Sequence, residues 1–173
     1  AFKLIELNKK FNFIKNNTNI LDVGSYPGGW SQVSKKIAIN GKILSIDLKK
    51  MDDLKDIYFL QCDFLEKTTK GKILRFFGVN LDVVLSDMAA DTTGNKSLDC
   101  IRTNQLCSEI INLSSKILKH NGTLVSKVFM GDDFLEVKEL AKSKFKKVQF
   151  FKPEASRDES KETYLHCTKL KTL

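Results

Sequence analysis

Residues 19–30 read Asn19-Ile20-Leu21-Asp22-Val23-Gly24-Ser25-Tyr26-Pro27-Gly28-Gly29-Trp30, and this stretch decides the fold. The apolar run at residues 20–23 is typical of a short buried strand. The glycines that follow have no Cβ, so the backbone can turn sharply there and come close to a ligand. Trp30 begins a segment with helical apolar spacing. A strand, a glycine turn and a helix in this order predict a ligand-binding turn of an α/β sheet.

The rest of the chain repeats this alternation of strand and helix, which predicts a mostly parallel sheet with helices on both faces. The last two strands have no helix between them, so we expect them to pair antiparallel at one edge. Such a seven-stranded sheet, antiparallel at its last strand, suits the Rossmann-like fold of class I S-adenosylmethionine-dependent methyltransferases better than a dinucleotide-binding dehydrogenase. We expect one domain, residues 1–173. The expected strands are residues 20–23, 42–47, 57–61, 81–86, 123–129, 147–151 and 162–168, and the expected helices are residues 2–13, 29–40, 69–77, 99–118 and 131–145.

The charge of the chain favours a polyanionic partner. Lys and Arg number 29 against 21 Asp and Glu, which gives a formal net charge of +8. Nucleic acid is a common partner of such proteins, although a lysine-rich surface alone would give the same balance. No run approaches the ~20 apolar residues of a membrane span, so no membrane partner is expected.

The four cysteines do not form a recognisable metal or disulfide pattern. Cys62, Cys100, Cys107 and Cys167 include no C-x-x-C pair, and no histidine lies beside them in the sequence. We therefore expect reduced thiols, an intracellular protein and no metal ion. The compartment stays open: cytoplasm in a bacterium, mitochondrion or nucleus in a eukaryote.

Four acidic residues follow successive strands and indicate the ligand. Asp22, Asp47, Asp63 and Asp87 each stand at or just after a strand end, where parallel α/β sheets bind ligands. Acidic side chains would repel a phosphate group. The sequence also contains neither a Walker loop nor a G-x-G-x-x-G turn. Each acid alone could be an ordinary strand-end or helix-capping residue. Together they favour S-adenosylmethionine, with Asp47 on the ribose, Asp63 on the adenine amino group and Asp87 near the sulfonium.

A longer set of motifs resembles a known family across essentially the whole chain. Residues 21–33 are similar to the Asp-Leu-Gly-x-x-Pro-Gly-Gly-Trp-Ser-Gln signature of FtsJ/RrmJ-type ribosomal RNA 2′-O-methyltransferases. One departure is Ala90, which stands where family members usually carry proline. The resemblance continues in order through Cys62-Asp63-Phe64, Ser86-Asp87-Met88-Ala89, Thr93-Gly94, Lys127-Val128-Phe129-x-Gly131, Lys152-Pro153 and Ser160-Lys161-Glu162-x-Tyr164.

The resemblance implies two sets of site residues. The family's Lys-Asp-Lys-Glu catalytic set corresponds to Lys3, Asp87, Lys127 and Glu162. Cofactor contacts are implied at Gly28, Trp30, Asp47, Asp63 and Asp87, and the remainder of the turn adds Asp22, Gly24, Pro27 and Gly29 as cofactor-binding candidates.

Lys127 is the residue that we expect at the ribose 2′-hydroxyl. It interrupts a strand that otherwise looks buried, and lysine is rarely buried unless it is paired. A lysine at its ordinary pKa near 10.4 is a poor base at neutral pH, but two adjacent ammonium groups disfavour each other's charge. We therefore expect Lys3 and Lys127 to be neighbours, with Asp87 and Glu162 orienting them. Whether Lys127 is a base or an orienting cation is left open.

The expected reaction is 2′-O-methylation of a uridine in large-subunit ribosomal RNA, by a monomer acting on the RNA or on the large ribosomal subunit. One alternative is a transfer-RNA 2′-O-methyltransferase. A second is a non-catalytic RNA- or ribosome-binding module on the same scaffold, which would have lost at least one of the four catalytic positions. A dehydrogenase would instead bind NADH in preference to S-adenosylmethionine.

Overall fold

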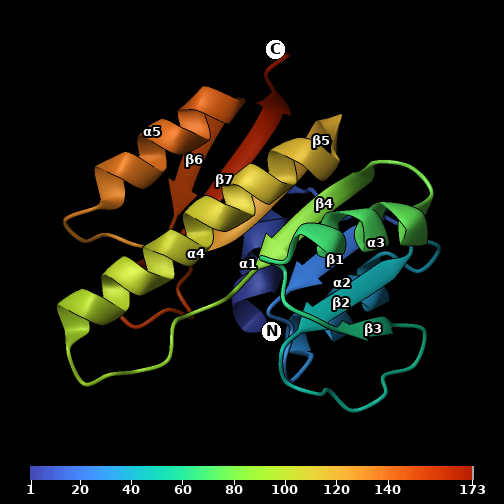
Figure 1. Cartoon of the computed structure of the whole chain (residues 1–173), viewed down its shortest axis with the longest axis horizontal. Helices are drawn as coiled ribbons and strands as arrows, with labels where there is room; N and C mark the ends of the chain where they lie inside the picture. Colours follow the sequence, from blue (N-terminus) through green and yellow to red (C-terminus); the bar gives the residue numbers. More distant parts are fainter. Residues whose placement is uncertain (173) are drawn as a thin grey trace.

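A computed structural model describes residues 1–172 and contains one seven-stranded sheet with the order β3-β2-β1-β4-β5-β7-β6 (Figure 1). Strands β1 to β5 run parallel, and β7 lies antiparallel between β5 and β6. This arrangement confirms the predicted fold class. The strands are β1 (Ile20–Val23), β2 (Ile43–Asp47), β3 (Tyr58–Gln61), β4 (Leu81–Ser86), β5 (Leu118–Phe129), β6 (Phe145–Phe151) and β7 (Glu162–Leu170).

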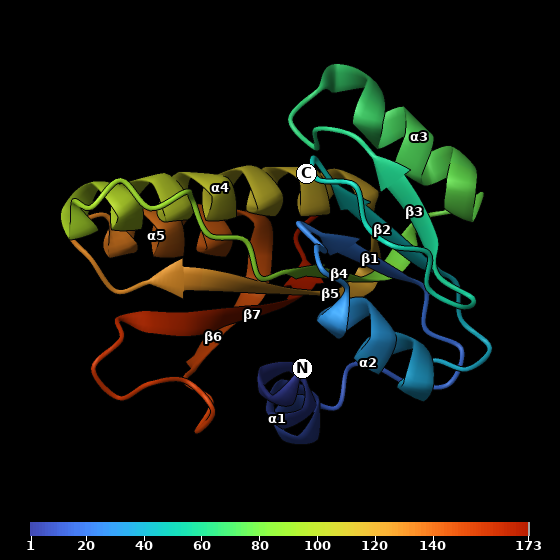
Figure 2. The same cartoon turned by 90° about the horizontal axis from the view of Figure 1, so that it is seen from below.

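Helices cover both faces of the sheet. Helices α1 and α2 lie on one face, and α3, α4 and α5 lie on the other (Figure 2). Within residues 1–172, none of these helices combines the length and the apolar character that a membrane span requires. The helices are α1 (Phe2–Phe11), α2 (Gly29–Ile37), α3 (Lys67–Phe77), α4 (Lys96–Ile117) and α5 (Phe134–Lys144).

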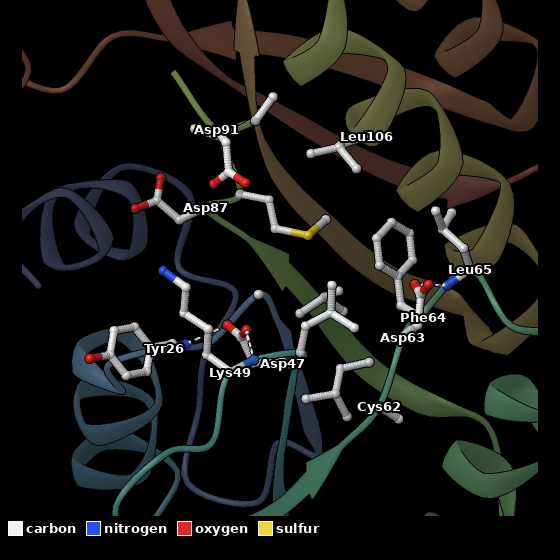
Figure 3. A pocket seen from close by; sticks show the side chains of 17 residues that line it. Tyr26, Asp47, Lys49, Cys62, Asp63, Phe64, Leu65, Asp87, Asp91 and Leu106 are labelled. Carbon is white, nitrogen blue, oxygen red and sulfur yellow. Dashed lines mark hydrogen bonds between the residues drawn. The ribbon is translucent and has the colours of Figure 1, made fainter. Parts of the chain in front are cut away.

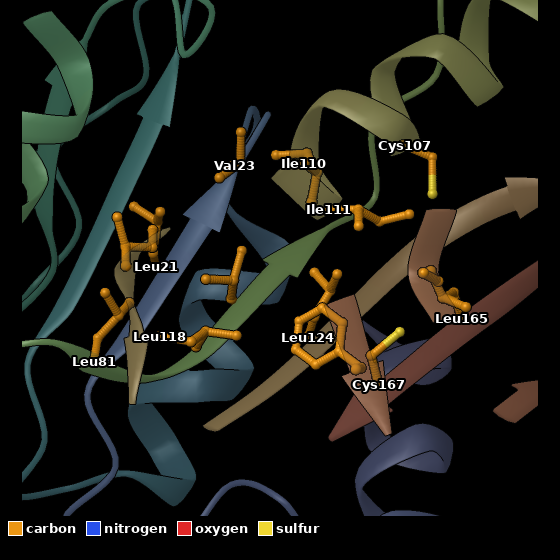
Figure 4. Packing of buried hydrophobic residues seen from close by; sticks show 14 of the residues in the cluster. Leu21, Val23, Leu81, Cys107, Ile110, Ile111, Leu118, Leu124, Leu165 and Cys167 are labelled. Atoms are coloured by element: carbon orange, nitrogen blue, oxygen red, sulfur yellow. The ribbon is translucent and has the colours of Figure 1, made fainter. Parts of the chain in front are cut away.

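The central strands are apolar on both sides because each face of the sheet is covered. In β1, Leu21 and Val23 belong to the core under α3, α4 and α5, whereas Ile20 belongs to the core under α1 and α2. Successive side chains of a strand point to opposite faces, so a continuous apolar run fills both cores. Figure 4 shows the first of these cores, where Ile110 of α4 lies near Val23 of β1 and Leu21 lies near Leu81 and Leu118.

Ten of the twelve elements begin or end at residues other than the predicted ones, and two of these differences have a clear structural cause. Helix α4 begins at Lys96 rather than at residue 99, because the Asn95 side chain caps it by accepting a hydrogen bond from Leu98 N. Strand β5 begins at Leu118 rather than at residue 123. In place of the turn predicted near Gly122, the β4–β5 pairing has an irregularity. Between two successive pairs, β5 advances from Leu118 to residue 123, whereas β4 advances only from residue 81 to residue 83. Such a bulge bends a strand without ending it.

Helix α1 is fixed to the sheet at both its buried face and its end. Leu4 and Leu7 are fully buried in the second core. At the end of the helix, Asn8 Oδ1 accepts hydrogen bonds from the backbone N–H groups of Phe13 and Ile14. These contacts hold the helix in a defined position, and that position directs Lys3 toward the sheet.

His166 makes stability depend on pH. It is 5% exposed, its ring stacks on Phe11 at 3.9 Å, and its Nδ1 has no hydrogen-bond partner within residues 1–172. Burial, with a smaller effect of Lys147, lowers the pKa of His166 from 6.5 to about 4. The unfolded chain therefore binds the extra proton more readily, and stability is lost as the pH falls from 6.5 toward 4.

His166→Phe is expected to remove this part of the pH dependence, because phenylalanine keeps the stacking on Phe11 and cannot be protonated. Urea denaturation measures the free energy of unfolding of both proteins. The difference, variant minus wild type, should be about 3 kcal/mol larger at pH 4 than at pH 7. A constant difference between the two proteins over that range would contradict the assignment.

Candidate active site

A cavity of about 440 Å³ opens over the carboxyl ends of β1, β2, β3 and β4 (Figure 3). Three of the acids singled out in the sequence, Asp47, Asp63 and Asp87, line it together with Gly24. This placement follows from the topology, because the carboxyl ends of neighbouring parallel strands meet at one edge of the sheet. The other lining residues are Val23, Tyr26, Ile46, Leu48, Lys49, Cys62, Phe64, Leu65, Met88, Ala89, Ala90, Asp91 and Leu106.

Asp47 is held at the end of β2 by two backbone hydrogen bonds. Its Oδ2 accepts from Tyr26 N and its Oδ1 accepts from Lys49 N, both at 2.8 Å. Each carboxylate oxygen has more than one lone pair, so both can still accept a further hydrogen bond. A carboxylate fixed in this way is suited to bind the two hydroxyls of a ribose.

The far side of the cavity combines one acid with apolar side chains. Asp63 Oδ1 accepts a hydrogen bond from Leu65 N at 2.9 Å. Phe64 and Leu65 lie beside it in Figure 3, and Leu106 also lines the cavity. An apolar slot with one acceptor fits a flat heterocycle that carries an amino group, as adenine does.

Two glycines of the turn are required by its backbone. Gly24 has φ +70°, and a Cβ there would lie 2.1 Å from Met88 Cγ. Gly28 has φ +118°, and a Cβ there would lie 2.6 Å from Leu54 Cδ1. Side chains are strained at these dihedral angles and have no room. Gly24 lines the cavity, whereas Gly28 lies outside the lining and close to Leu54.

Five of the predicted cofactor residues lie outside the cavity lining. Asp22 is buried behind the turn, where its Oδ2 accepts a hydrogen bond from Ser31 Oγ at 2.6 Å, and burial raises the pKa of Asp22 to about 7. Trp30 belongs to the second core and packs beside Tyr164, with ring centroids 5.7 Å apart. These contacts join the turn to α2 and to the sheet. The other three residues outside the lining are Pro27, Gly28 and Gly29.

The four predicted catalytic residues meet beside this cavity. Glu162 bridges the two lysines: Lys3 Nζ lies 2.8 Å from its Oε2, and Lys127 Nζ lies 3.1 Å from its Oε1. Lys127 Nζ also lies 3.3 Å from Asp87 Oδ1. Asp87 lines the cavity, so the set is continuous with it. The two lysines are thus linked through Glu162.

Glu162 is ionised because of these lysines. Its side chain is 7% exposed, and burial by itself would raise its pKa. The hydrogen bond from Lys3 and the charge of Lys127 outweigh burial, so the pKa of Glu162 lies below its usual value. The negative charge between the lysines is therefore maintained at neutral pH.

Two further side chains complete the cluster, and sequence reasoning did not assign them to the site. Tyr164 donates a hydrogen bond to Asp87 Oδ1 at 2.5 Å, and Ser156 Oγ donates to Glu162 Oε2 at 3.0 Å. Burial, followed by the charge of Asp87, raises the pKa of Tyr164, so its phenol keeps its proton. The sequence feature that could have identified Tyr164 is its position two residues after Glu162, because side chains two residues apart in a strand lie on the same face.

A seven-stranded sheet of this order, with a cavity over the ends of β1 to β4 and a fixed acid at the end of β2, defines a class I S-adenosylmethionine-dependent methyltransferase. The lining fits this cofactor, because Asp47 suits the ribose and the slot beside Asp63 suits the adenine. A family model described as FtsJ-like methyltransferase matches residues 1–170, and the chain belongs to this family.

Curated relatives agree over most of the chain. A protein of Pelagibacter ubique named ribosomal RNA large subunit methyltransferase E is 42% identical over 167 residues, which cover 96% of this chain and 82% of that protein. A protein of the same name from Rickettsia akari is 42% identical over 171 residues, which cover 95% and 75% of the two chains.

Solved structures agree as well. A Plasmodium falciparum crystal structure, described as that of a ribosomal RNA methyltransferase, has a TM-score of 0.86 and 31% identity, with 98% of this chain and 95% of that chain covered. Human methyltransferase-like protein 13, crystallised with S-adenosylhomocysteine, has a TM-score of 0.65 at 15% identity, with 94% and 82% covered. The second likeness supports the fold alone.

Asp47→Ala is expected to weaken binding of S-adenosylmethionine about 10- to 100-fold, since hydrogen bonds to a charged acceptor contribute roughly 1.5–3 kcal/mol. Isothermal titration calorimetry measures the change. Asp53→Ala is the matched control, because Asp53 is an exposed acid of the next loop and does not line the cavity. Equal affinities of the two variants would contradict the placement of the ribose.

Proposed function

We propose that this protein transfers the methyl group of S-adenosylmethionine to a ribose 2′-hydroxyl, that of a uridine, in large-subunit ribosomal RNA. The observation that carries the proposal is the position of Lys127, whose ammonium group is held by Asp87 and Glu162 directly beside the cofactor cavity. The names of the Pelagibacter and Rickettsia relatives support the large-subunit RNA as substrate. The bound cofactor supplies an electrophilic methyl group.

Lys127 orients the hydroxyl and stabilises the negative charge that develops on its oxygen as the hydroxyl proton is released to solvent and the methyl group is received. An ammonium group has three N–H donors. The ammonium nitrogen lies 3.3 Å from Asp87 and 3.1 Å from Glu162, so at least one N–H donor is left for the substrate oxygen. The Lys127 side chain is 12% exposed, and such partial burial strengthens an electrostatic contact relative to one in water.

The other members of the set keep this ammonium group in place. Glu162 Oε2 accepts hydrogen bonds from both Lys3 and Ser156, which fixes the carboxylate whose Oε1 lies beside Lys127. Asp87 is fixed by the phenol of Tyr164. Because each carboxylate has a second donor, Lys127 has little freedom to move away, and such positioning can supply several kcal/mol of the barrier.

The RNA partner fits the net charge of +8, and a folded RNA would be bound largely through its phosphates and shape. We propose that the protein acts as a monomer on the RNA or on the large ribosomal subunit. Sedimentation of the protein alone and with isolated subunits tests both statements.

The proposal is tested by transfer of a labelled methyl group from S-adenosylmethionine to three substrates side by side: large-subunit ribosomal RNA, isolated large ribosomal subunits and bulk transfer RNA. We expect label in one or both ribosomal substrates and background label in transfer RNA. Label confined to transfer RNA would replace the proposal with a transfer-RNA methyltransferase. Cofactor binding without transfer to any RNA would support a non-catalytic module.

A further inference from the structure

A second cavity, of about 470 Å³, lies at the end of β5 and shares no lining residue with the cofactor cavity. Three segments form its walls: the beginning of α4, the end of β5 with the residues after it, and the loop between β6 and β7. Figure 2 shows these segments at one end of the molecule. Its lining residues are Lys96, Ser97, Asp99, Cys100, Ile101, Phe129, Gly131, Asp132, Asp133, Arg157, Glu159, Ser160 and Lys161.

The wall of this second cavity is continuous with the catalytic set. Phe129 of the wall is the direct partner of Glu162 in the β5–β7 pairing. Ser160 Oγ, also in the wall, accepts a hydrogen bond from Glu162 N at 3.1 Å. Asp87, at the other end of the set, lines the cofactor cavity. The catalytic set therefore adjoins the cofactor cavity at Asp87 and the wall of the second cavity at Glu162.

Asn104 makes this wall rigid. The β4–β5 pairing ends at Ser86 and Ser126, so Phe129 lies beyond the reach of β4. The buried Asn104 replaces the missing strand: its Oδ1 accepts from Phe129 N at 2.8 Å, and its Nδ2 donates to Phe129 O at 2.9 Å. Nδ2 also donates to Asp133 Oδ1 at 2.8 Å. The cavity is preformed, as small-ligand sites generally are.

The chemistry of the lining suits a neutral heterocycle and not a phosphate. Its cations are Lys96, Arg157 and Lys161, and its acids, which outnumber them, are Asp99, Asp132, Asp133 and Glu159. Phosphate sites carry the opposite balance. Phe129 and Ile101 supply apolar surface, and a guanidinium such as that of Arg157 can stack on a flat ring. Mixed donors and acceptors around apolar surface match the face and edges of a nucleobase.

We propose that the second cavity receives the base of the nucleotide whose ribose is methylated; this rests on the proposed function. The ribose 2′-hydroxyl must reach Lys127, and the cofactor occupies the cavity that Asp87 lines. The base attached to that ribose then enters the second cavity, whose wall adjoins Glu162 through Phe129 and Ser160. RNA bases in loops are commonly splayed out and bound in this manner.

The test fills the second cavity with a larger side chain and measures whether the loss of activity depends on the base of the methylated nucleotide. Ile101→Trp adds a large side chain at a lining residue that is 39% exposed. Gln105→Trp is the matched control, since Gln105 is exposed one turn further along α4 and lines neither cavity. The substrates are two synthetic copies of the RNA region mapped as methylated. One copy is intact, and the other lacks the base at the methylated position but keeps its ribose.

Ile101→Trp is expected to lower kcat/KM on the intact RNA by about 10-fold or more, as loss of a stacked base does. On the RNA that lacks the base, the variant and wild type should be alike, and Gln105→Trp should match wild type on both. Unchanged kcat/KM on intact RNA, or an equal loss on both RNAs, would overturn the inference. Absence of methylation by wild type on any ribosomal substrate would instead overturn the proposed function and the inference with it. Unaltered calorimetric affinity for S-adenosylmethionine shows that the variants are folded.

Discussion

Lys127→Ala is expected to reduce the rate of methyl transfer by about 10³-fold, the loss typical of removing a group that acts on the reacting oxygen. Affinity for S-adenosylmethionine should stay close to that of wild type, because Lys127 does not line the cofactor cavity. Asp87 and Glu162 keep their hydrogen bonds from Tyr164 and Ser156, so the remaining site stays assembled. Single-turnover transfer to RNA and calorimetric titration of the cofactor measure the two quantities separately.

Lys119→Ala provides the matched control for this prediction. Lys119 is on the same strand, β5, and also forms an ion pair, with Asp82 at 2.9 Å, but its side chain is 42% exposed. Exposed pairs of this kind contribute about 0–1 kcal/mol to stability. This variant should transfer methyl groups at the wild-type rate. Near-normal turnover by Lys127→Ala would show that the reacting hydroxyl is held elsewhere.

Glu162→Gln is expected to lower the rate about 100-fold, because Lys127 and Lys3 lose the charge that fixes them. Breaking a buried ion pair costs roughly 3–5 kcal/mol, and the partial exposure of Lys3 reduces this to about 2 kcal/mol. The folded-state pKa of Glu162 lies below its usual value of 4.5, so its contribution is present above that value. The stability difference from wild type should shrink as the pH falls below 4.5, and urea denaturation at several pH values measures it.

Glu154→Gln is the control for Glu162→Gln, since Glu154 is an exposed acid of the loop that precedes β7 and lines neither cavity. Its variant should behave as wild type in both rate and stability. If Glu162→Gln matched wild type in rate, or if its stability loss persisted unchanged below pH 4, Glu162 would not have the role described.

The sequence was most informative where function depends on local geometry. The glycine turn and the acids Asp47, Asp63 and Asp87 could be placed in advance, because residues at the ends of parallel strands must meet at one edge. Asp22 shows the limit of that rule. It stands one residue before the end of β1, yet its side chain points behind the turn to Ser31, and only packing decides on which side of a strand a residue lies.

Long-range contacts were less accessible. Lys3 and Glu162 form a hydrogen bond although 159 positions separate them, and only the family resemblance suggested that they belong to one site. The second cavity had no sequence signal, because its walls come from three separate segments held together by Asn104. The sequence also did not reveal the bulge in β5, because the same residues are typical of a turn between a helix and a strand.

The most direct test of the central claim is nucleoside analysis of large-subunit ribosomal RNA after incubation with the protein and methyl-labelled S-adenosylmethionine. The RNA is digested to nucleosides, and mass spectrometry locates the label in the base or in the ribose. We predict label in a single 2′-O-methylated uridine with wild-type protein, and none with Lys127→Ala. Label in a base, or equal ribose labelling by Lys127→Ala, would contradict the proposed chemistry.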